Sequence, residues 1–318
     1  MASVTVRDAR GAHMSAVAPS VGRVSTSSVP YLARPIVSTQ WLADQLGREH
    51  LVVVDASVLL VPGFDGRPGY LSGDEQYLLE GHVPGAVFGD LLEQLSDPAA
   101  PLPFTRLDPE RFAAATAALG IDDDSVVVVY DSAVGQWASR LWWLLRSAGH
   151  DAVAVLDGGL PAWRREERPI ETGHVEPAVS GGISVREERP LWIDKAGVES
   201  VVRGEAPGAL VCAVPPKEFT GEEGRRPRLG HLPGSRSVPA GRLVDRADNT
   251  LLPPERLRSL FGDALQAERI VLYCGGGIAA TADALALAVL GVHTAVVYDG
   301  SLNEWAADPE APLVVTAA

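Results

Sequence analysis

The sequence predicts an α/β protein with two tandem domains, each built on a mostly parallel sheet with helices on both faces. Two observations lead to this prediction. Short, continuous apolar runs alternate with segments of helical spacing, as they do in the strand–helix–strand units of parallel sheets. Several short motifs also occur twice, in the same order and at a nearly constant separation, which indicates a duplicated unit of roughly 140 residues.

Three pairs of motifs define the duplication. One match of this kind could arise by chance, whereas an ordered set favours a repeated domain. The pairs are GHVPGA at 81–86 with GHLPGS at 230–235, VVVVYD at 126–131 with RIVLYC at 269–274, and DGGL at 157–160 with DGSL at 299–302.

Apolar runs and helical spacing predict the elements of each unit. In the first unit, strands are expected at 51–54, 86–88, 126–130 and 152–156, and helices at 109–119 and 137–147. In the second, strands are expected at 209–214, 237–238, 270–273 and 294–298, and helices at 254–265 and 279–290.

The domain limits follow from the segments between these patterns. Residues 171–184 contain several Gly and Pro breakers and predict the linker, with the boundary near residue 180. Domains are therefore expected at 35–175 and 185–318. Residues 1–34 have no apolar periodicity, so we expect a disordered extension there.

Composition excludes several classes of protein. Hydrophobic residues make up 46% of the 318 residues, enough for two cores without disulfides or metals. No apolar run approaches the roughly 20 residues that a membrane span needs. The net charge of −14 disfavours nucleic acid and anionic membranes as partners. Only two cysteines, Cys212 and Cys274, are present, which favours a reducing cytoplasm over a disulfide scaffold.

The clearest chemical motif is a cysteine between an apolar strand and a helix. Glycines let the backbone wrap around one atom, successive N–H groups bind an anion, and the following helix adds its positive end. The natural anion is the thiolate or persulfide of Cys274, which is therefore the expected nucleophile. The residues expected to surround it are Gly275, Gly276, Gly277, Ile278 and Ala279.

Other interpretations of this motif remain open. Cys274 could be a buried structural cysteine, and the loop could bind phosphate, although it lacks the phosphate-loop and dinucleotide fingerprints. The first repeat has Asp131 at the equivalent position, so only the second repeat keeps a nucleophile. Cys212 is expected to be a buried thiol rather than a second reactive one.

As a set, these motifs resemble the tandem rhodanese and mercaptopyruvate sulfurtransferases. The resemblance covers residues 36–315 and includes the YD…AxRxWWxLR stretch at 130–146 and YDGS…EW at 298–305. It implies two rhodanese-like domains, the first inactive and the second catalytic, with a persulfide in the loop 274–279. We therefore expect a sulfurtransferase that takes sulfur from a small-molecule donor and passes it to a small nucleophile or an accepting protein. No metal, nucleotide or flavin cofactor is expected.

Two departures from the family bear on the donor. Thiosulfate enzymes resemble CRKGVT at the loop and mercaptopyruvate enzymes CGSGVT, whereas this chain has CGGGIA. The family's two substrate-binding arginines align with Val214 and Glu218. Lys217, Arg225 and Arg226 could replace their charge, or could form a solvated loop. Because desolvating a dianion requires fixed cations, a monoanionic donor such as 3-mercaptopyruvate is expected to be better than thiosulfate.

Two first-domain residues are further candidates. Asp55 and His82 match positions that mercaptopyruvate enzymes use for proton handling, although His82 could instead satisfy backbone groups in its own turn. Three tryptophans in the stretch 137–143 are expected in the core or the domain interface. Two alternative functions stay open: a persulfide relay to a partner protein, and a non-catalytic rhodanese-like binding module.

Overall fold

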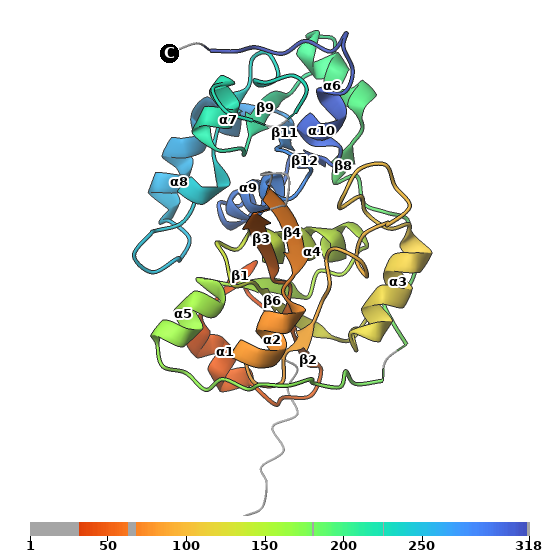
Figure 1. The fold of residues 1–318 in the computed structure, drawn as a ribbon, viewed down its shortest axis with the longest axis vertical. Coiled ribbons are helices and arrows are strands. Elements are labelled where there is room, and N and C mark those ends of the chain that lie inside the picture. Colours follow the sequence, from red (N-terminus) through yellow and green to blue (C-terminus); the bar gives the residue numbers. More distant parts are fainter. Residues whose placement is uncertain (1–31, 63–67, 180, 225, 317–318) are drawn as a thin grey trace, which may run out of the picture.

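The computed structural model describes residues 32–62, 68–179, 181–224 and 226–316, so most of the expected extension 1–34 lies outside the described residues. Each half of the chain contains one five-stranded sheet, and the two halves are stacked along the long axis (Figure 1). All strand pairs within these two sheets are parallel. The predicted α/β class with two tandem sheet domains is confirmed.

The first sheet has the strand order β1-β7-β6-β2-β5. Successive β6 residues face opposite sides, as the twofold period of a strand requires, and both sides are covered by apolar side chains. The strands are β1 Ile36–Val37, β2 Leu51–Asp55, β5 Val87–Phe88, β6 Val126–Tyr130 and β7 Val153–Leu156. The helices of this domain are α1 Thr39–Gln45, α2 Asp74–Glu80, α3 Pro109–Ala118, α4 Gln136–Ser147 and α5 Gly159–Arg165.

The second sheet has the order β10-β9-β11-β12-β8. Its strands are β8 Trp192–Ile193, β9 Ala209–Cys212, β10 Arg236–Ser237, β11 Ile270–Tyr273 and β12 Ala295–Tyr298. Its helices are α6 Lys195–Val202, α7 Pro216–Thr220, α8 Pro254–Phe261, α9 Ala279–Val289 and α10 Ser301–Trp305, with 3₁₀ turns at Ala240–Arg242 and Gly262–Gln266.

One apolar core cluster extends through both domains, and a second lies in the first domain alone. Helices α4 and α9, which follow equivalent strands in the two repeats, pack against each other at the centre of Figure 1. Ten of the twelve α4 residues are buried, including Trp142 and Trp143, and Trp143 lies edge-on to Trp192 of the second domain. Trp142 and Trp143 are therefore core and interface residues, in agreement with the prediction, whereas Trp137 is buried but also lines a pocket between the domains.

The structure contains elements that periodicity did not predict. Strands β3 (Val58–Pro62) and β4 (Pro68–Ser72) form an antiparallel hairpin outside the main sheets. The edge strands β1 and β8 have two residues each, too few for a periodic signal. The helix expected at 254–265 ends at Phe261, because Gly262 leaves the helical region (φ 53°) and the chain continues as a 3₁₀ turn.

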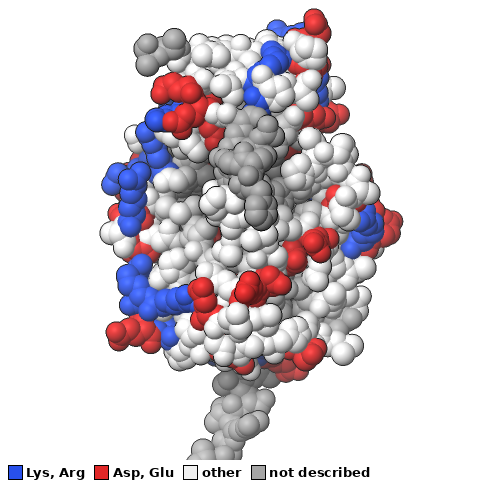
Figure 2. Space-filling model, in the orientation of Figure 1, with Lys and Arg blue, Asp and Glu red and all other residues white. Residues whose placement is uncertain are grey.

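Charge on the surface is mixed. On the face drawn in Figure 2, acidic and basic side chains lie along both edges, and acidic side chains also extend across the lower part of the face. No helix among the described residues combines the length and apolarity that a membrane crossing needs.

Candidate active site

Cys274 lies at the carboxyl end of β11, a central strand of the second sheet, and directly before the loop that leads into α9. Ligands of open parallel sheets bind at this edge. Only 2% of the Cys274 residue surface is exposed, so the thiol itself is largely shielded from water.

A network of hydrogen bonds holds the cysteine loop on the segment that begins α10. Ser301 Oγ accepts the backbone N–H of Cys274 (3.1 Å) and that of Gly277 (3.2 Å). The carbonyls of Cys274 and Gly275 in turn accept the amides of Leu302 and Asn303. Within the described part of the chain, the backbone N–H groups of Gly275, Gly276 and Ile278 donate no hydrogen bond.

The equivalent loop of the first domain contains an anion. Asp131 is fully buried, and its carboxylate accepts four backbone N–H groups at 2.9–3.0 Å. These donors are Ala133, Gly135, Trp137 and Ala138. Burial raises the pKa of Asp131, while the four hydrogen bonds act in the opposite direction. The loop in this fold therefore forms a cradle of amides around a negative charge.

A pocket of about 560 Å³ opens over Cys274 and is lined by both domains. On the first-domain side, Tyr70, Phe104 and Trp137 form an aromatic wall with ring centroids 5.1–5.6 Å apart. On the second-domain side lie Val214, Glu218, Arg226, Asn303 and the cysteine loop. The sequence did not indicate Tyr70, Phe104 or Asn303, since each comes from a segment far from the cysteine motif.

Arg226 is the predicted cation that reaches this pocket. Its Nη1 atom pairs with Glu218 Oε2 at 3.0 Å, and its Nε atom donates to Asn303 Oδ1 at 3.1 Å. A Cβ atom on Gly275 would lie 2.5 Å from Arg226 Nη2. Glycine at this position therefore makes room for the guanidinium directly over the loop. The positions aligned with the family's arginines, Val214 and Glu218, also line the pocket.

Lys217, another predicted cation, is placed differently. Lys217 is exposed and pairs with Glu223 at 2.5 Å, and it is not among the residues that line the pocket. Arg225 lies outside the described residues.

Asp55 and His82 lie inside the first domain and do not line the Cys274 pocket. The Asp55 carboxylate accepts the amide of Ser57 at 2.9 Å, and burial raises the pKa of Asp55 to about 6. The His82 ring stacks on Tyr77, and its two nitrogens lie 3.0 Å from backbone carbonyl oxygens. His231 in the second domain is also stacked on an aromatic ring and bonded to a carbonyl. This shared geometry fits a histidine that satisfies backbone carbonyls, one in its own turn (Val83) and the others outside it (Gly173 and Phe219).

The second thiol is inaccessible. Cys212 is fully buried at the end of β9, and burial raises the pKa of Cys212 to about 12. Among the described residues, no group of three or more His, Cys, Asp or Glu side chains is arranged to hold a metal ion.

Comparison with known proteins identifies relatives over most of the chain. The model of the rhodanese-like domain matches residues 38–166 and 210–308. A 3-mercaptopyruvate sulfurtransferase from Escherichia coli is 34% identical over 282 residues, which cover 87% of this chain and 96% of that protein. A putative thiosulfate sulfurtransferase, SseB, from Mycobacterium tuberculosis is 36% identical over 258 residues, which cover 78% of this chain and 86% of that protein.

Solved structures agree with these relatives. The crystal structure of SseA from Escherichia coli, described as a 3-mercaptopyruvate sulfotransferase with the rhodanese fold, superposes with a TM-score of 0.73 at 31% identity. The superposition covers 84% of this chain and 98% of that one.

Proposed function

This chain belongs to the rhodanese-like family of sulfurtransferases, and we propose that it carries the transferred sulfur as a persulfide on Cys274. The catalytic domain in this proposal is 185–318. The domain 35–175 is inactive, because Asp131 occupies the place of the nucleophile. The first domain instead supplies one wall of the pocket.

The observation that carries the proposal is the amide cradle around Asp131. A loop of the same origin holds a negative charge with four backbone N–H groups. In the second domain a cysteine stands where the carboxylate stands in the first. The amides of Gly276 and Ile278, which match those of Ala133 and Gly135, have no hydrogen-bond acceptor among the described residues and are left for a thiolate or persulfide, whereas the Thr281 amide donates to the Ile278 carbonyl. Such donors stabilise an anion without reorganising. An intact cysteine loop of this kind also argues against a non-catalytic binding module.

The reaction has two half-reactions. The Cys274 thiolate attacks the sulfur of the donor, the bond between that sulfur and the rest of the donor breaks, and the leaving group departs with the electron pair. For a mercaptopyruvate-like donor, the leaving enolate then takes up a proton. An acceptor nucleophile next attacks the outer sulfur, the S–S bond breaks, and the Cys274 thiolate is regenerated. Ping-pong kinetics follow.

The charges in the pocket favour a monoanionic donor. Arg226 presents one cation beside the loop, and Glu218 neutralises part of it at 3.0 Å. A single carboxylate can share this guanidinium, whereas thiosulfate requires compensation for two charges. The aromatic wall accommodates the carbon skeleton of an organic donor. We therefore propose a 3-mercaptopyruvate-like donor in preference to thiosulfate, and a reducing, cytoplasmic setting, which keeps Cys274 free between turnovers.

The test is intact-protein mass after incubation with each donor. We expect an added sulfur atom on the wild type and on Cys212→Ser, and none on Cys274→Ser, whose fold is checked by circular dichroism. Steady-state kcat/KM should be higher for 3-mercaptopyruvate than for thiosulfate. Full transfer activity in Cys274→Ser would refute the mechanism, and better turnover of thiosulfate would refute the donor assignment.

A second candidate is delivery of sulfur to a partner protein. The β3–β4 hairpin exposes Leu60, Tyr70 and Leu71, and the first two of these line the pocket. Exposed apolar side chains of this kind can dock a protein that brings its own cysteine to Cys274. If neither small donor loads Cys274 while a persulfidated protein does, the relay replaces the enzyme acting on metabolites.

A further inference from the structure

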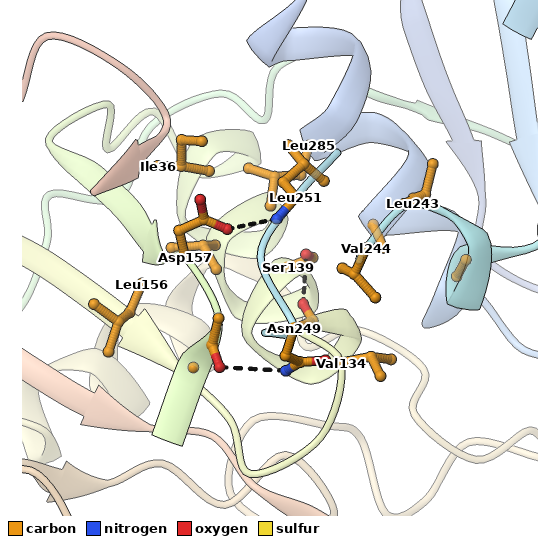
Figure 3. Close-up of a pocket in the computed structure, with 16 residues that line it drawn as sticks. Ile36, Val134, Ser139, Leu156, Asp157, Leu243, Val244, Asn249, Leu251 and Leu285 are labelled. Carbon is orange, nitrogen blue, oxygen red and sulfur yellow. Dashed lines mark hydrogen bonds between the residues drawn. The ribbon is translucent and has the colours of Figure 1, made fainter. Parts of the chain in front are cut away.

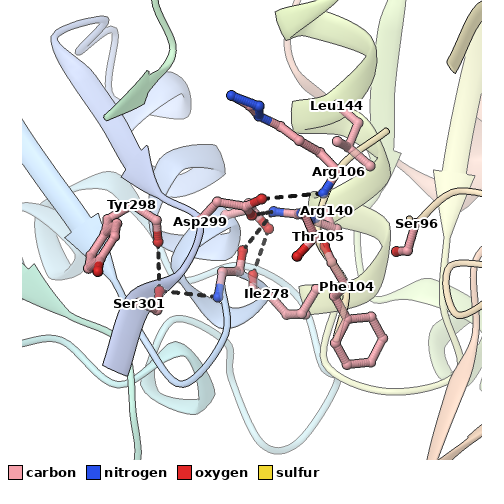
Figure 4. A network of polar contacts seen from close by, with 12 residues as sticks. Ser96, Phe104, Thr105, Arg106, Arg140, Leu144, Ile278, Tyr298, Asp299 and Ser301 are labelled. Atoms are coloured by element: carbon pink, nitrogen blue, oxygen red, sulfur yellow. Dashed lines mark hydrogen bonds and ion pairs between the residues drawn. The ribbon is translucent and has the colours of Figure 1, made fainter. Parts of the chain in front are cut away.

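Arg140 reaches from α4 of the first domain into the cysteine loop of the second (Figure 4). It is 1% exposed. Its Nη1 atom donates to Asp299 Oδ1 at 2.6 Å and to the carbonyl oxygen of Gly277 at 3.3 Å, and its Nη2 atom donates to the Phe104 carbonyl at 2.7 Å. One buried guanidinium thus connects the two domains at the residue in the middle of the loop.

We infer that Arg140 is a positioning residue, which holds the Gly277–Ile278 peptide so that the Ile278 N–H faces the sulfur on Cys274. The inference rests on the proposed persulfide chemistry and assigns to the inactive domain a part in it. In a trans peptide the carbonyl and the following N–H point in opposite directions, and the described residues contain no cis peptide. Holding the Gly277 oxygen toward Arg140 therefore turns the Ile278 N–H away from Arg140.

The first domain supports this direction for the Ile278 amide. Ile278 lies four residues after Cys274, as Gly135 lies four residues after Asp131. The Gly135 N–H donates to the Asp131 carboxylate at 3.0 Å. By position in the duplication, the Ile278 N–H corresponds to the Gly135 N–H, although the glycine with positive φ is Gly135 in the first loop and Gly277 in the second.

Removal of the guanidinium would leave two acceptors facing each other. The Gly277 backbone, with φ +77°, lies so close to Asp299 that a Cβ atom would be 2.7 Å from Asp299 Oδ1 and 3.2 Å from Arg140 Nη1. Without Arg140, the Asp299 carboxylate and the Gly277 carbonyl lose a shared buried donor. Rotation of the Gly277–Ile278 peptide would relieve this, and would take the Ile278 N–H away from the sulfur.

The equivalent positions on the other side of the domain interface do not form a pair of this kind. Asp157, the counterpart of Asp299, accepts the amide of Leu251 at 2.7 Å (Figure 3). The α9 residue equivalent to Arg140 is Asp283, whose carboxylate has no hydrogen-bond partner among the described residues. Of the two equivalent positions, 140 and 283, only the one beside the cysteine loop therefore carries a guanidinium. Asp157→Asn consequently provides a matched control, since it weakens an interdomain contact that does not touch the loop.

The experiment compares Arg140→Met, Arg140→Lys and Asp157→Asn with the wild type. We expect Arg140→Met to lower kcat by up to roughly 100- to 1,000-fold, the usual effect of losing one oriented donor, with KM changed less than about twofold. Arg140→Lys, which keeps a donor, should recover part of kcat, and Asp157→Asn should retain it. Equal kcat in Arg140→Met and Asp157→Asn would overturn the inference.

A second readout does not require sulfur transfer. Hydrogen exchange of the 275–279 amides should be faster in Arg140→Met than in Asp157→Asn, because the loop peptide is no longer held. If the wild type forms no persulfide, the proposed function fails, while the exchange comparison still decides whether Arg140 orders the loop. If Arg140→Met does not fold, the same comparison is made with Asp299→Asn, and unchanged loop exchange there overturns the inference.

Discussion

Replacement of Glu218 by Gln should make the pocket accept thiosulfate. Glu218 is the anion closest to the pocket cation, with 3.0 Å between its Oε2 and Arg226 Nη1. Gln keeps the shape and a hydrogen-bond acceptor but removes the charge. The variant therefore separates repulsion of an anionic donor from the packing of the pocket.

The size of the effect follows from charge and exposure. At roughly 6 Å and an effective dielectric constant of about 20, one unit charge repels another by about 3 kcal/mol. The Glu218 side chain is 32% exposed, and solvent screening reduces such terms to about 1 kcal/mol for each charge. A dianion should therefore gain about 2 kcal/mol and a monoanion about 1 kcal/mol. These values correspond to roughly 30-fold and 5-fold increases in kcat/KM.

The assay is steady-state kcat/KM for thiosulfate and for 3-mercaptopyruvate at low ionic strength. Glu223→Gln is the matched control, since Glu223 pairs with exposed Lys217 and its replacement makes the same change in net charge. The reasoning is refuted if thiosulfate turnover is unchanged in Glu218→Gln. It is also refuted if Glu223→Gln raises thiosulfate turnover equally.

Two further predictions follow from burial. At neutral pH iodoacetamide should label Cys274 well before Cys212, because burial raises the pKa of Cys212 to about 12; peptide mapping that finds Cys212 labelled first would contradict this. Burial also raises the pKa of Asp283 well above its ordinary value of 3.8. Above about pH 4 the Asp283 carboxyl is therefore protonated in the folded protein and ionised in the unfolded chain. Unfolding then releases a proton, so the free energy of unfolding falls as pH rises. Denaturant titrations should therefore find Asp283→Asn more stable than the wild type at pH 7, by an amount that shrinks toward pH 4; an advantage independent of pH would refute this linkage.

The sequence alone was sufficient for the features that depend on local pattern. A strand between its neighbours in a parallel sheet is a continuous apolar run, so the strands around Val126 and Ile270 could be recognised from a few residues each. The duplication identified two domains of one fold. The setting of Cys274 could also be read locally, because its strand, glycines and helix are consecutive in the chain.

Only the tertiary structure decided which distant side chains meet that loop. Arg140 and Gly277 are 137 residues apart, and their contact depends on how α4 packs on α9. Lys217 and Arg226 are both plausible cations in the sequence, yet α7 directs Lys217 to solvent and the chain after it brings Arg226 over Gly275. Local propensity contains no information about such approaches, because they are set by the packing of whole elements and by the reach of long side chains between them.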